Sequence, residues 1–442
     1  MDRRDFLRAG ALVSAGLLAG PRAVAQAGSA GSLPNFVLIL ADDLGWGDLG
    51  CYGSRSIATP NLDGLAAAGA RMTNFFSSAP VCSPSRAGLL TGRYPPRSGI
   101  TQVLFPHDSL MDLGLRVAGV PAGLPLDEIT LPDLLRRRGY ATAGVGKWHL
   151  GDQPQYRPVA RGFEHSFGPL YSNDMEPFEI YRGNEMVEKA PADQDRLTRQ
   201  YTAEAVRFIE QNQSKPFFLY LPHTFPHVPI HASPEFRGRS KGGLYGDAVE
   251  EIDWSTGRIL ETLARHGLTE NTLVLFSSDN GPWFQGSPGA FRGRKNETFD
   301  GGMRVPLIAR WPGRVQAGLV SDEMGMNLDL FTTLLSAAGA KVPGDRPIDG
   351  MDLLPVLAGQ KKSPHEALFF YQGAELQAIR VGRWKYHRRH RVLVYPFGKQ
   401  GPWLFDLEND PNESYDCSLK YPDVAKRLEQ MMLDFEATFK AR

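Results

Sequence analysis

The sequence predicts an α/β protein in which helices cover both faces of a mainly parallel sheet, followed by a smaller C-terminal α+β domain with an antiparallel sheet. Residues 35–41 form a continuous apolar run, which is typical of a strand buried on both faces. Strand-like runs then alternate with helix-like segments to about residue 338, an order that favours parallel strands joined by helical crossovers. Later strand-like runs follow one another directly, as in antiparallel sheets.

In the larger predicted domain, residues 33–345, capping residues, prolines and glycines mark where helices begin and end. Thr59, Pro60 and Gly69 suit the cap, first turn and end of a helix, and residues 130–139 repeat that pattern. We expect strands at 35–41, 141–145, 217–221 and 272–277, with 35–41 at the centre of the sheet, and further helices at 197–211, 245–266 and 328–338. The second domain, residues 346–442, is expected to hold strands at 368–371, 376–383 and 403–407 and a helix at 423–439.

The N-terminus, residues 1–27, has the composition of an export signal. Arginines precede an uncharged run at 9–20, and small residues end at Ala27. The apolar run is too short to span a bilayer. Arg3 and Arg4, followed by Asp-Phe-Leu, resemble the twin-arginine signal of bacteria. We therefore expect a periplasmic or secreted protein that uses the twin-arginine export machinery and is not stably inserted in the membrane after cleavage.

The charge limits which partners the protein can be expected to have, and the cysteine content limits its disulfides. Lys plus Arg and Asp plus Glu both number 49, so no global field favours nucleic acid or an anionic membrane as the main partner. Three cysteines, Cys51, Cys82 and Cys417, are too few for a dense disulfide framework. The sequence leaves open whether Cys51 and Cys417 pair, and two buried free thiols are the expected state.

The stretch of residues 81–93, V-C-S-P-S-R-A-G-L-L-T-G-R, reads as the start of a helix. Ser83 suits the N-cap and Pro84 the first helical position, which predicts that Cys82 lies just before the helix. Free N–H groups at a helix start favour an anion, and Arg86 adds a positive charge about one turn inside. The alternative is a buried cysteine that packs as a small hydrophobe.

Polar side chains follow several predicted strands. Asp42 and Asp43 follow the first strand, and Asp279 and Asn280 follow the strand at 272–277. Each alone is ordinary turn chemistry, but together they offer the oxygen ligands that Ca²⁺ or Mg²⁺ prefers. Parallel sheets bind their ligands at the carboxyl ends of the strands, which is where these four residues would lie.

Basic side chains also follow predicted strands. Lys147 and His149 lie two residues apart, so both would point the same way in an extended segment. His223 and His227 suggest a second metal site, although no matching ligands lie nearby in the sequence.

The Cys82 stretch is similar to the signature of the type I sulfatases, C-x-P-S-R-x-x-L-L-T-G, whose cysteine is oxidised to formylglycine. Further matching motifs occur in the family's order over about residues 34–440: N-F-V-L-I-L-A-D-D-L-G-W-G-D-L-G, T-P-N-L-D, G-K-W-H-L-G, R-G-F-E-H-S-F-G, S-S-D-N-G and G-G-M-R-V-P. The resemblance is greatest to the branch containing arylsulfatase A and N-acetylgalactosamine-6-sulfatase. It implies an alkaline-phosphatase-like fold and hydrolysis of aryl or carbohydrate sulfates.

The resemblance also implies a role for each site residue. Calcium, or alternatively magnesium, would be held by Asp42, Asp43, Asp279, Asn280 and the oxidised Cys82, the last formed by a formylglycine-generating enzyme. An aldehyde hydrate supplies an oxygen that fits this ligand set, whereas a thiolate does not. The other implied roles are hydrate binding by Arg86, sulfate binding by Lys147, proton transfer by His149, contact with the leaving-group oxygen by His227 and Lys295, and a substrate contact by Ser172. Asp300 departs from the family's usual Glu.

Three matters stay open at this stage. Relatives of the same architecture cleave phosphate or phosphonate esters, and a chain whose Cys82 is not oxidised would only bind sulfated glycans. The substrate is not named, since selectivity would lie in loops such as 102–124 and 171–190. The basic run at 385–391 is expected to be a solvated hairpin face, or alternatively a guide for a polyanionic glycan through Arg388, Arg389 and Arg391.

Overall fold

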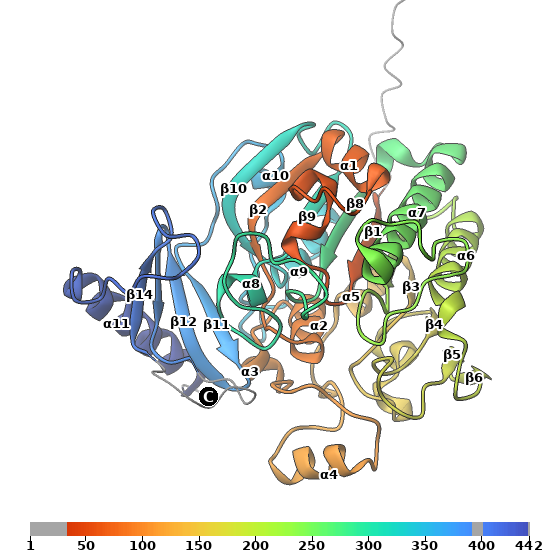
Figure 1. Ribbon diagram of the computed structural model, residues 1–442. Helices are drawn as coiled ribbons and strands as arrows, with labels where there is room; N and C mark the ends of the chain where they lie inside the picture. The colour runs from red at the N-terminus through yellow and green to blue at the C-terminus, as the bar shows by residue number, and fades with distance from the viewer. Residues whose placement is uncertain (1–32, 391–400, 441–442) are drawn as a thin grey trace, which may run out of the picture. The chain divides into compact units, whose positions relative to one another are not determined.

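The computed structural model describes residues 33–390 and 401–440, and the predicted export signal lies outside them (Figure 1). Its larger sheet has ten strands in the order β10-β2-β9-β8-β1-β7-β3-β4-β5-β6. These strands are β1 (Asn35–Ala41), β2 (Ala70–Phe76), β3 (Ala141–Val145), β4 (His165–Gly168), β5 (Ile180–Arg182), β6 (Glu185–Glu188), β7 (Phe217–Pro222), β8 (Thr272–Ser278), β9 (Leu307–Arg310) and β10 (Leu319–Met326).

The middle of this sheet is parallel, as predicted. β1 pairs in parallel with β7 on one side and β8 on the other, and β3 continues the parallel block between β7 and β4. Antiparallel pairings join β9 to β8 and β2, and β5 to β4 and β6. All seven residues of β1 are buried, and the predicted ranges 35–41 and 141–145 match the observed strands at both ends. The predicted fold class is confirmed.

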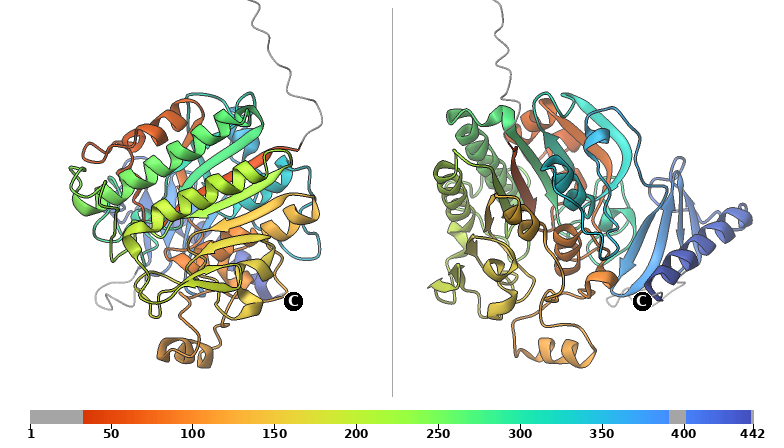
Figure 2. Two further views of the ribbon diagram at one scale, coloured as in Figure 1. Left: turned by 90° about the vertical axis from the view of Figure 1, so that its right-hand side faces the viewer. Right: turned by 180° about the vertical axis from the view of Figure 1, so that it is seen from behind.

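Helices lie on both faces of the sheet (Figures 1 and 2). On one face α6 and α7 lie side by side, with α1 beside α7. On the other, α2 contacts α5 and α9. The helices are α1 (Pro60–Ala67), α2 (Cys82–Thr91), α3 (Pro95–Ser98), α4 (Leu110–Val117), α5 (Leu131–Arg137), α6 (Leu197–Gln211), α7 (Gly243–Arg265), α8 (Asp300–Met303), α9 (Asp329–Ala337), α10 (Leu354–Leu357) and α11 (Pro422–Lys440).

Alternate side chains of β1 enter two separate cores, one under each helical layer. Phe36, Leu38 and Leu40 pack with the apolar residues of α2, α5 and α9. Val37 and Ile39 pack with those of α1, α6 and α7. Because successive strand residues point to opposite faces, a strand covered on both sides must be apolar throughout, and this explains the continuous run in the sequence.

The C-terminal part forms a separate antiparallel sheet in the order β11-β12-β13-β14, covered by α11 (Figure 1). Its strands are β11 (Leu368–Gln372), β12 (Glu375–Val381), β13 (Trp384–His387) and β14 (Trp403–Asp406). The sheet lies within the predicted second domain, whose boundary at residue 346 stays a prediction.

The basic run on β13 is not the solvated face expected from the sequence. Lys385 and His387 are fully buried, because Lys385 pairs with Asp300 and both contact Glu413. Arg391 lies outside the described residues.

Cys51 and Cys417 are free, as expected, although they are half-buried rather than buried. Among the helices of residues 33–390 and 401–440, none is both long enough and apolar enough to cross a bilayer.

Candidate active site

Cys82 is the first residue of α2, with Val81 in an extended conformation before it. The sequence placed Cys82 one residue outside the helix, with Ser83 as the cap. Ser83 does not cap, because its hydroxyl accepts a hydrogen bond from the Leu104 main chain at 3.1 Å. All ten residues of α2 are buried, so Cys82 faces an enclosed site. Burial raises the pKa of its thiol, and a protonated thiol is a poor nucleophile.

The polar ends of β1 and β8 come together beside Cys82. These strands are parallel neighbours with Ala41 opposite Ser278, so the residues that follow them leave the sheet at one edge. The Asp43 main chain donates to Asp279 Oδ1 at 3.2 Å, and Asn280 Nδ2 donates to Asp43 Oδ1 at 2.7 Å. The predicted convergence of Asp42, Asp43, Asp279 and Asn280 is therefore seen in the structure.

Two buried cations neutralise part of this carboxylate cluster. Arg86 Nη2 lies 2.9 Å from Asp279 Oδ2 and 3.3 Å from Asp42 Oδ2, and Lys147 Nζ contacts the same Asp42 oxygen. Burial would raise the pKa of Asp42, but Lys147 and Arg86 outweigh it and hold that pKa well below its usual value. Burial and the Asp42 charge raise the pKa of Asp279 to about 6.

Several oxygens of the cluster are arranged as a cation site would require. Asp42 Oδ1 and the side-chain oxygen of Asn280 are buried and accept no hydrogen bond, whereas Asp42 Oδ2 pairs with Lys147 and Arg86. Asp42, Asp43 and His227 each place a ligand atom within 4.8 Å of the others. A buried oxygen without a donor is costly unless a cation or water satisfies it. This oxygen-rich set fits the hard cation that the sequence predicted.

Lys147, Ser172 and His227 are linked to one another next to the carboxylates. Lys147 Nζ donates to Ser172 Oγ at 3.1 Å, and Ser172 Oγ lies 3.5 Å from both ring nitrogens of His227. Nδ1 of His227 lies 3.0 Å from Asn173 Oδ1, which orients the ring with Nε2 3.7 Å from Asp43. Burial and the Lys295 charge lower the pKa of His227.

His149 lies near this cluster, but not for the reason that the sequence suggested. The segment is not extended, since His149 has a φ of 63°. Its Nε2 lies 2.9 Å from the Leu104 carbonyl oxygen, while Nδ1 is buried with no hydrogen-bond partner. Burial and the nearby charges of Lys147 and Arg86 lower the pKa of His149, so the ring is a neutral base.

Lys295 completes the site from an irregular segment between β8 and α8. Its Nζ lies 2.8 Å from Asp43 Oδ2, and the carboxylate keeps the pKa of this lysine above its usual value despite burial. The side chain is 11% exposed, against 5% for His227 and 0% for Lys147. The site therefore meets solvent on the side of Lys295 and His227.

His223 is not part of the site. Both of its ring nitrogens are buried without a hydrogen-bond partner, and burial lowers its pKa to about 3. The second metal site that the histidine pair suggested is absent from the described residues around it, where only His227 reaches the carboxylates.

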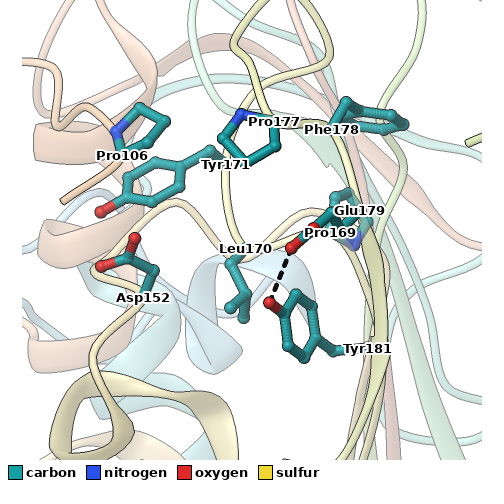
Figure 3. A pocket seen from close by; sticks show the side chains of 9 residues that line it. All are labelled: Pro106, Asp152, Pro169, Leu170, Tyr171, Pro177, Phe178, Glu179 and Tyr181. Carbon is teal, nitrogen blue, oxygen red and sulfur yellow. Dashed lines mark hydrogen bonds between the residues drawn. The ribbon is translucent and has the colours of Figure 1, made fainter. Parts of the chain in front are cut away.

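A small pocket adjoins the site where the two expected selectivity loops meet (Figure 3). Tyr171, next to Ser172, lines it, and the centres of the Tyr171 and His149 rings lie 5.8 Å apart with the ring planes nearly perpendicular. Pro106 comes from one loop, and Phe178, Glu179 and Tyr181 come from the other. The lining is Pro106, Asp152, Pro169, Leu170, Tyr171, Pro177, Phe178, Glu179 and Tyr181.

Comparisons with known proteins identify the family of this chain. The profile of the Sulfatase family matches residues 34–340, and that of the C-terminal part of N-sulphoglucosamine sulphohydrolase matches residues 290–438. The chain belongs to the sulfatase family. As a sulfatase, it is a sulfuric ester hydrolase, and the predicted type I resemblance is confirmed.

Individual relatives resemble this sulfatase over most of its length. N-acetylgalactosamine-6-sulfatase of Rattus norvegicus is 44% identical, covering 90% of this chain and 84% of the rat protein. Steryl-sulfatase of Mus musculus is 37% identical, covering 94% and 83%. A solved Bacteroides thetaiotaomicron structure, described with the metabolism of multiple glycosaminoglycans, has a TM-score of 0.83 and 27% identity, covering 92% of this chain and 100% of that one.

Sequence reasoning missed two residues of the sulfatase site. Asn173 orients His227, and Tyr171 both contacts the His149 ring and lines the pocket. Both flank Ser172, so the signal was their position beside a predicted contact.

Proposed function

We propose that this sulfatase hydrolyses carbohydrate or aryl sulfates with a formylglycine derived from Cys82 beside a calcium ion. The observation that carries the proposal is the meeting of a buried Cys82 with Lys147, Arg86 and an oxygen cluster in which Asp42 Oδ1 and Asn280 Oδ1 have no donor. A thiol with a raised pKa does not serve as the nucleophile, whereas formylglycine supplies a hydroxyl when hydrated.

Asp42, Asp43, Asp279, Asn280 and the oxidised residue 82 would hold the metal. Ca²⁺, or alternatively Mg²⁺, supplies positive charge that polarises the sulfate oxygens. The chain adds Lys147 and Arg86, which are fully buried and therefore act with little screening. Arg86 is fixed by four contacts, since its Nη1 also donates to the Lys147 carbonyl oxygen at 2.6 Å.

The remaining side chains would move protons. Lys295, kept protonated by Asp43, can donate to the ester oxygen of the leaving alcohol, and His227 contacts that oxygen from the neighbouring side. His149, kept neutral, can accept the proton released when sulfate departs. Ser172, held by Lys147, contacts the substrate between them.

The pocket beside Tyr171 supports a carbohydrate rather than a simple aryl sulfate. Carboxylates at Asp152 and Glu179 can accept hydrogen bonds from sugar hydroxyls, and the rings of Tyr171, Phe178 and Tyr181 offer apolar faces (Figure 3). The printed names of relatives include an N-acetylgalactosamine-6-sulfatase. A panel of sulfated monosaccharides and aryl sulfates tests this preference, which a uniform kcat/KM across both groups would contradict.

A polyanionic guide on β13 receives little support. Arg388 pairs with Glu429 and Glu436, and Arg389 pairs with Glu375, so neither described arginine carries an uncompensated charge. We propose export through the twin-arginine pathway to the periplasm or beyond, on the strength of the N-terminal sequence alone.

The test of the nucleophile is mass spectrometry of the tryptic peptide of residues 72–86 from the exported protein. An aldehyde at position 82 is expected, together with loss of sulfatase activity in Cys82→Ala. An unmodified thiol in fully active enzyme would contradict the proposal. The ratio of sulfate to phosphonate ester turnover separates the proposal from its alternative, an esterase for phosphorus esters.

A further inference from the structure

The main chain that carries Lys295 is a loop whose position depends on contacts outside it. The Lys295 N–H donates to the Pro282 carbonyl oxygen at 3.0 Å, and the Asn296 N–H donates to that of Pro80 at 2.9 Å. The base of the loop is closed by the Gly301 N–H, which donates to the Arg292 carbonyl oxygen at 2.7 Å. A lysine side chain is long and flexible, so the place of its ammonium depends on how firmly this backbone is held.

Glu413 binds both ends of that loop. Its Oε2 accepts a hydrogen bond from the Asp300 N–H at 2.7 Å, and its main-chain oxygen accepts one from Arg292 Nη1 at 2.7 Å. The guanidinium of Arg292 also lies 4.0 Å from the centre of the Phe299 ring. One residue, more than one hundred positions away in sequence, therefore clamps the loop at residues 292 and 300.

The smaller sheet fixes Glu413 in turn. Its Oε1 lies 3.0 Å from both Lys385 Nζ and His387 Nε2 on β13, and Lys385 Nζ lies 2.6 Å from Asp300 Oδ1. The side chains of Lys385, Asp300, His387 and Glu413 are all 0% exposed. Glu413 also has a φ of 51°, a conformation that a non-glycine residue holds only when its surroundings impose it.

We propose that Glu413 is a positioning residue for Lys295. Through Lys385 and β13 it ties the loop of residues 292–301 to the smaller sheet, and this fixes the distance between the Lys295 ammonium and the leaving-group oxygen. The inference rests on the role proposed for Lys295. It gives the C-terminal sheet a part in the reaction without any direct contact with the substrate.

The test is the dependence of rate on the leaving group. Glu413→Gln keeps the size of the side chain and an acceptor for Asp300, but removes the charge that Lys385 binds. With a series of aryl sulfates, we expect kcat/KM to fall ~10-fold or more for the ester of the least acidic phenol and less than ~3-fold for that of the most acidic, because only poor leaving groups need the proton. A general loss of active protein would lower all esters by one factor.

Three further variants of the formylglycine-containing enzyme complete the experiment. Lys295→Met should steepen the dependence on phenol acidity more than Glu413→Gln does. The double variant should be no steeper than Lys295→Met alone, since the two residues act through one proton. Glu128→Gln is the matched control, because its buried pair with Arg93, at 2.6 Å, touches no part of the loop. It should leave the slope unchanged.

The outcomes separate the positioning role of Glu413 from the proton-donating role of Lys295. A steeper slope in both single variants supports the positioning role. A steep slope in Lys295→Met with an unchanged slope in folded Glu413→Gln overturns that role and leaves the function of Lys295 intact. An unchanged slope in Lys295→Met overturns both. Circular dichroism and thermal midpoints establish that each variant is folded.

Discussion

At the residue scale, His223 shows how burial alone can make stability depend on pH. The ring has no hydrogen-bond partner, and burial lowers its pKa to about 3. Below pH 6.5 the unfolded chain binds a proton that the folded chain does not, so stability falls as pH falls towards 3. We expect His223→Leu to gain ~2 kcal/mol of stability relative to the native sequence between pH 8 and pH 5, measured by denaturant unfolding.

His365 provides the control of opposite sign. Burial would lower its pKa, but Asp329, 2.9 Å away, outweighs burial and raises it. Its contribution is present below the unfolded pKa and is lost as pH rises through the folded value. The stability of His365→Gln, relative to the native sequence, should therefore worsen towards low pH. If His223→Leu instead lost stability towards low pH, as His365→Gln should, the lowered pKa of His223 would be refuted.

Much of the candidate site could be predicted from the sequence, because several of its residues directly follow predicted strands. Asp42 and Asp279 follow neighbouring parallel strands. The alternation of strands and helices in the sequence predicts a parallel sheet, and this was enough to predict that the two residues lie close together. The partner of His227 was not predictable, because Asn173 reaches it across 54 positions through loop geometry. The prediction for His149 assumed that its backbone is extended, and its φ of 63° shows that it is not.

At the element scale, the turn after β3 positions Lys147, and the conformation of this turn requires a glycine at position 146. Its φ is 127°, and a Cβ there would overlap the carbonyl oxygen of Pro222 on β7. The same carbonyl accepts the hydrogen bond of the Lys147 N–H at 2.8 Å. We expect Gly146→Ala to cost more than ~3 kcal/mol and to lower kcat/KM at least ~100-fold, because the turn must move with Lys147.

Gly139→Ala is the matched control for Gly146→Ala. Its φ is 91°, but no atom lies within 4 Å of the place a Cβ would take. It should cost only the ~1–2 kcal/mol of a left-handed conformation, with kcat/KM unchanged. Equal losses of stability and activity in the two alanine variants would show that strain, and not the Pro222 contact, sets the effect.

The ends of β1 and β8 should also report metal binding directly. Since Asp42 and Asn280 each present one side-chain oxygen, Oδ1, without a donor, Ca²⁺ should bind the folded chain and raise its thermal midpoint. Free Ca²⁺ at ~100 times its dissociation constant corresponds to ~2.7 kcal/mol of stabilisation. Chelation should reverse this shift and abolish activity, and Asp42→Asn should greatly reduce the shift. A midpoint insensitive to Ca²⁺ in the active enzyme would contradict the ligand set.

The sequence predicted the central parallel strands better than the rest of the larger sheet. β1 was predicted to the residue because of its nearly continuous apolar run, and β3 because its short run lies between the end of a predicted helix at Gly139 and Gly146. β10 was missed because, as an edge strand, it alternates between exposed and buried residues and includes charges. β5 and β6 were missed because three or four residues give no periodicity to detect.

At the scale of the whole molecule, the two sheets share one apolar core. Phe76 at the end of β2 and Tyr94 pack in the same cluster as Phe370, Ile379 and the other buried residues of the smaller sheet. The rings of Phe76 and Phe370 lie 5.4 Å apart. The buried pair of Asp300 and Lys385 adds a charged contact between the sheets, although Asp300 also pairs with Arg304 and Lys385 with Glu413.

This shared core leads us to expect one cooperative unfolding transition for residues 33–442, although the sequence divides them into two domains. If either sheet separated first, the apolar cluster and a fully buried charge would be exposed while the other sheet remained folded. Calorimetry of the metal-loaded enzyme should therefore give a single peak with equal calorimetric and van't Hoff enthalpies. Lys385→Met leaves the Asp300 carboxylate buried without this partner, so it should move the whole peak to lower temperature rather than split it. Two resolved peaks in the native enzyme would instead mean that the smaller sheet folds independently, and Glu413 could then hold the Lys295 loop only while that sheet stayed docked.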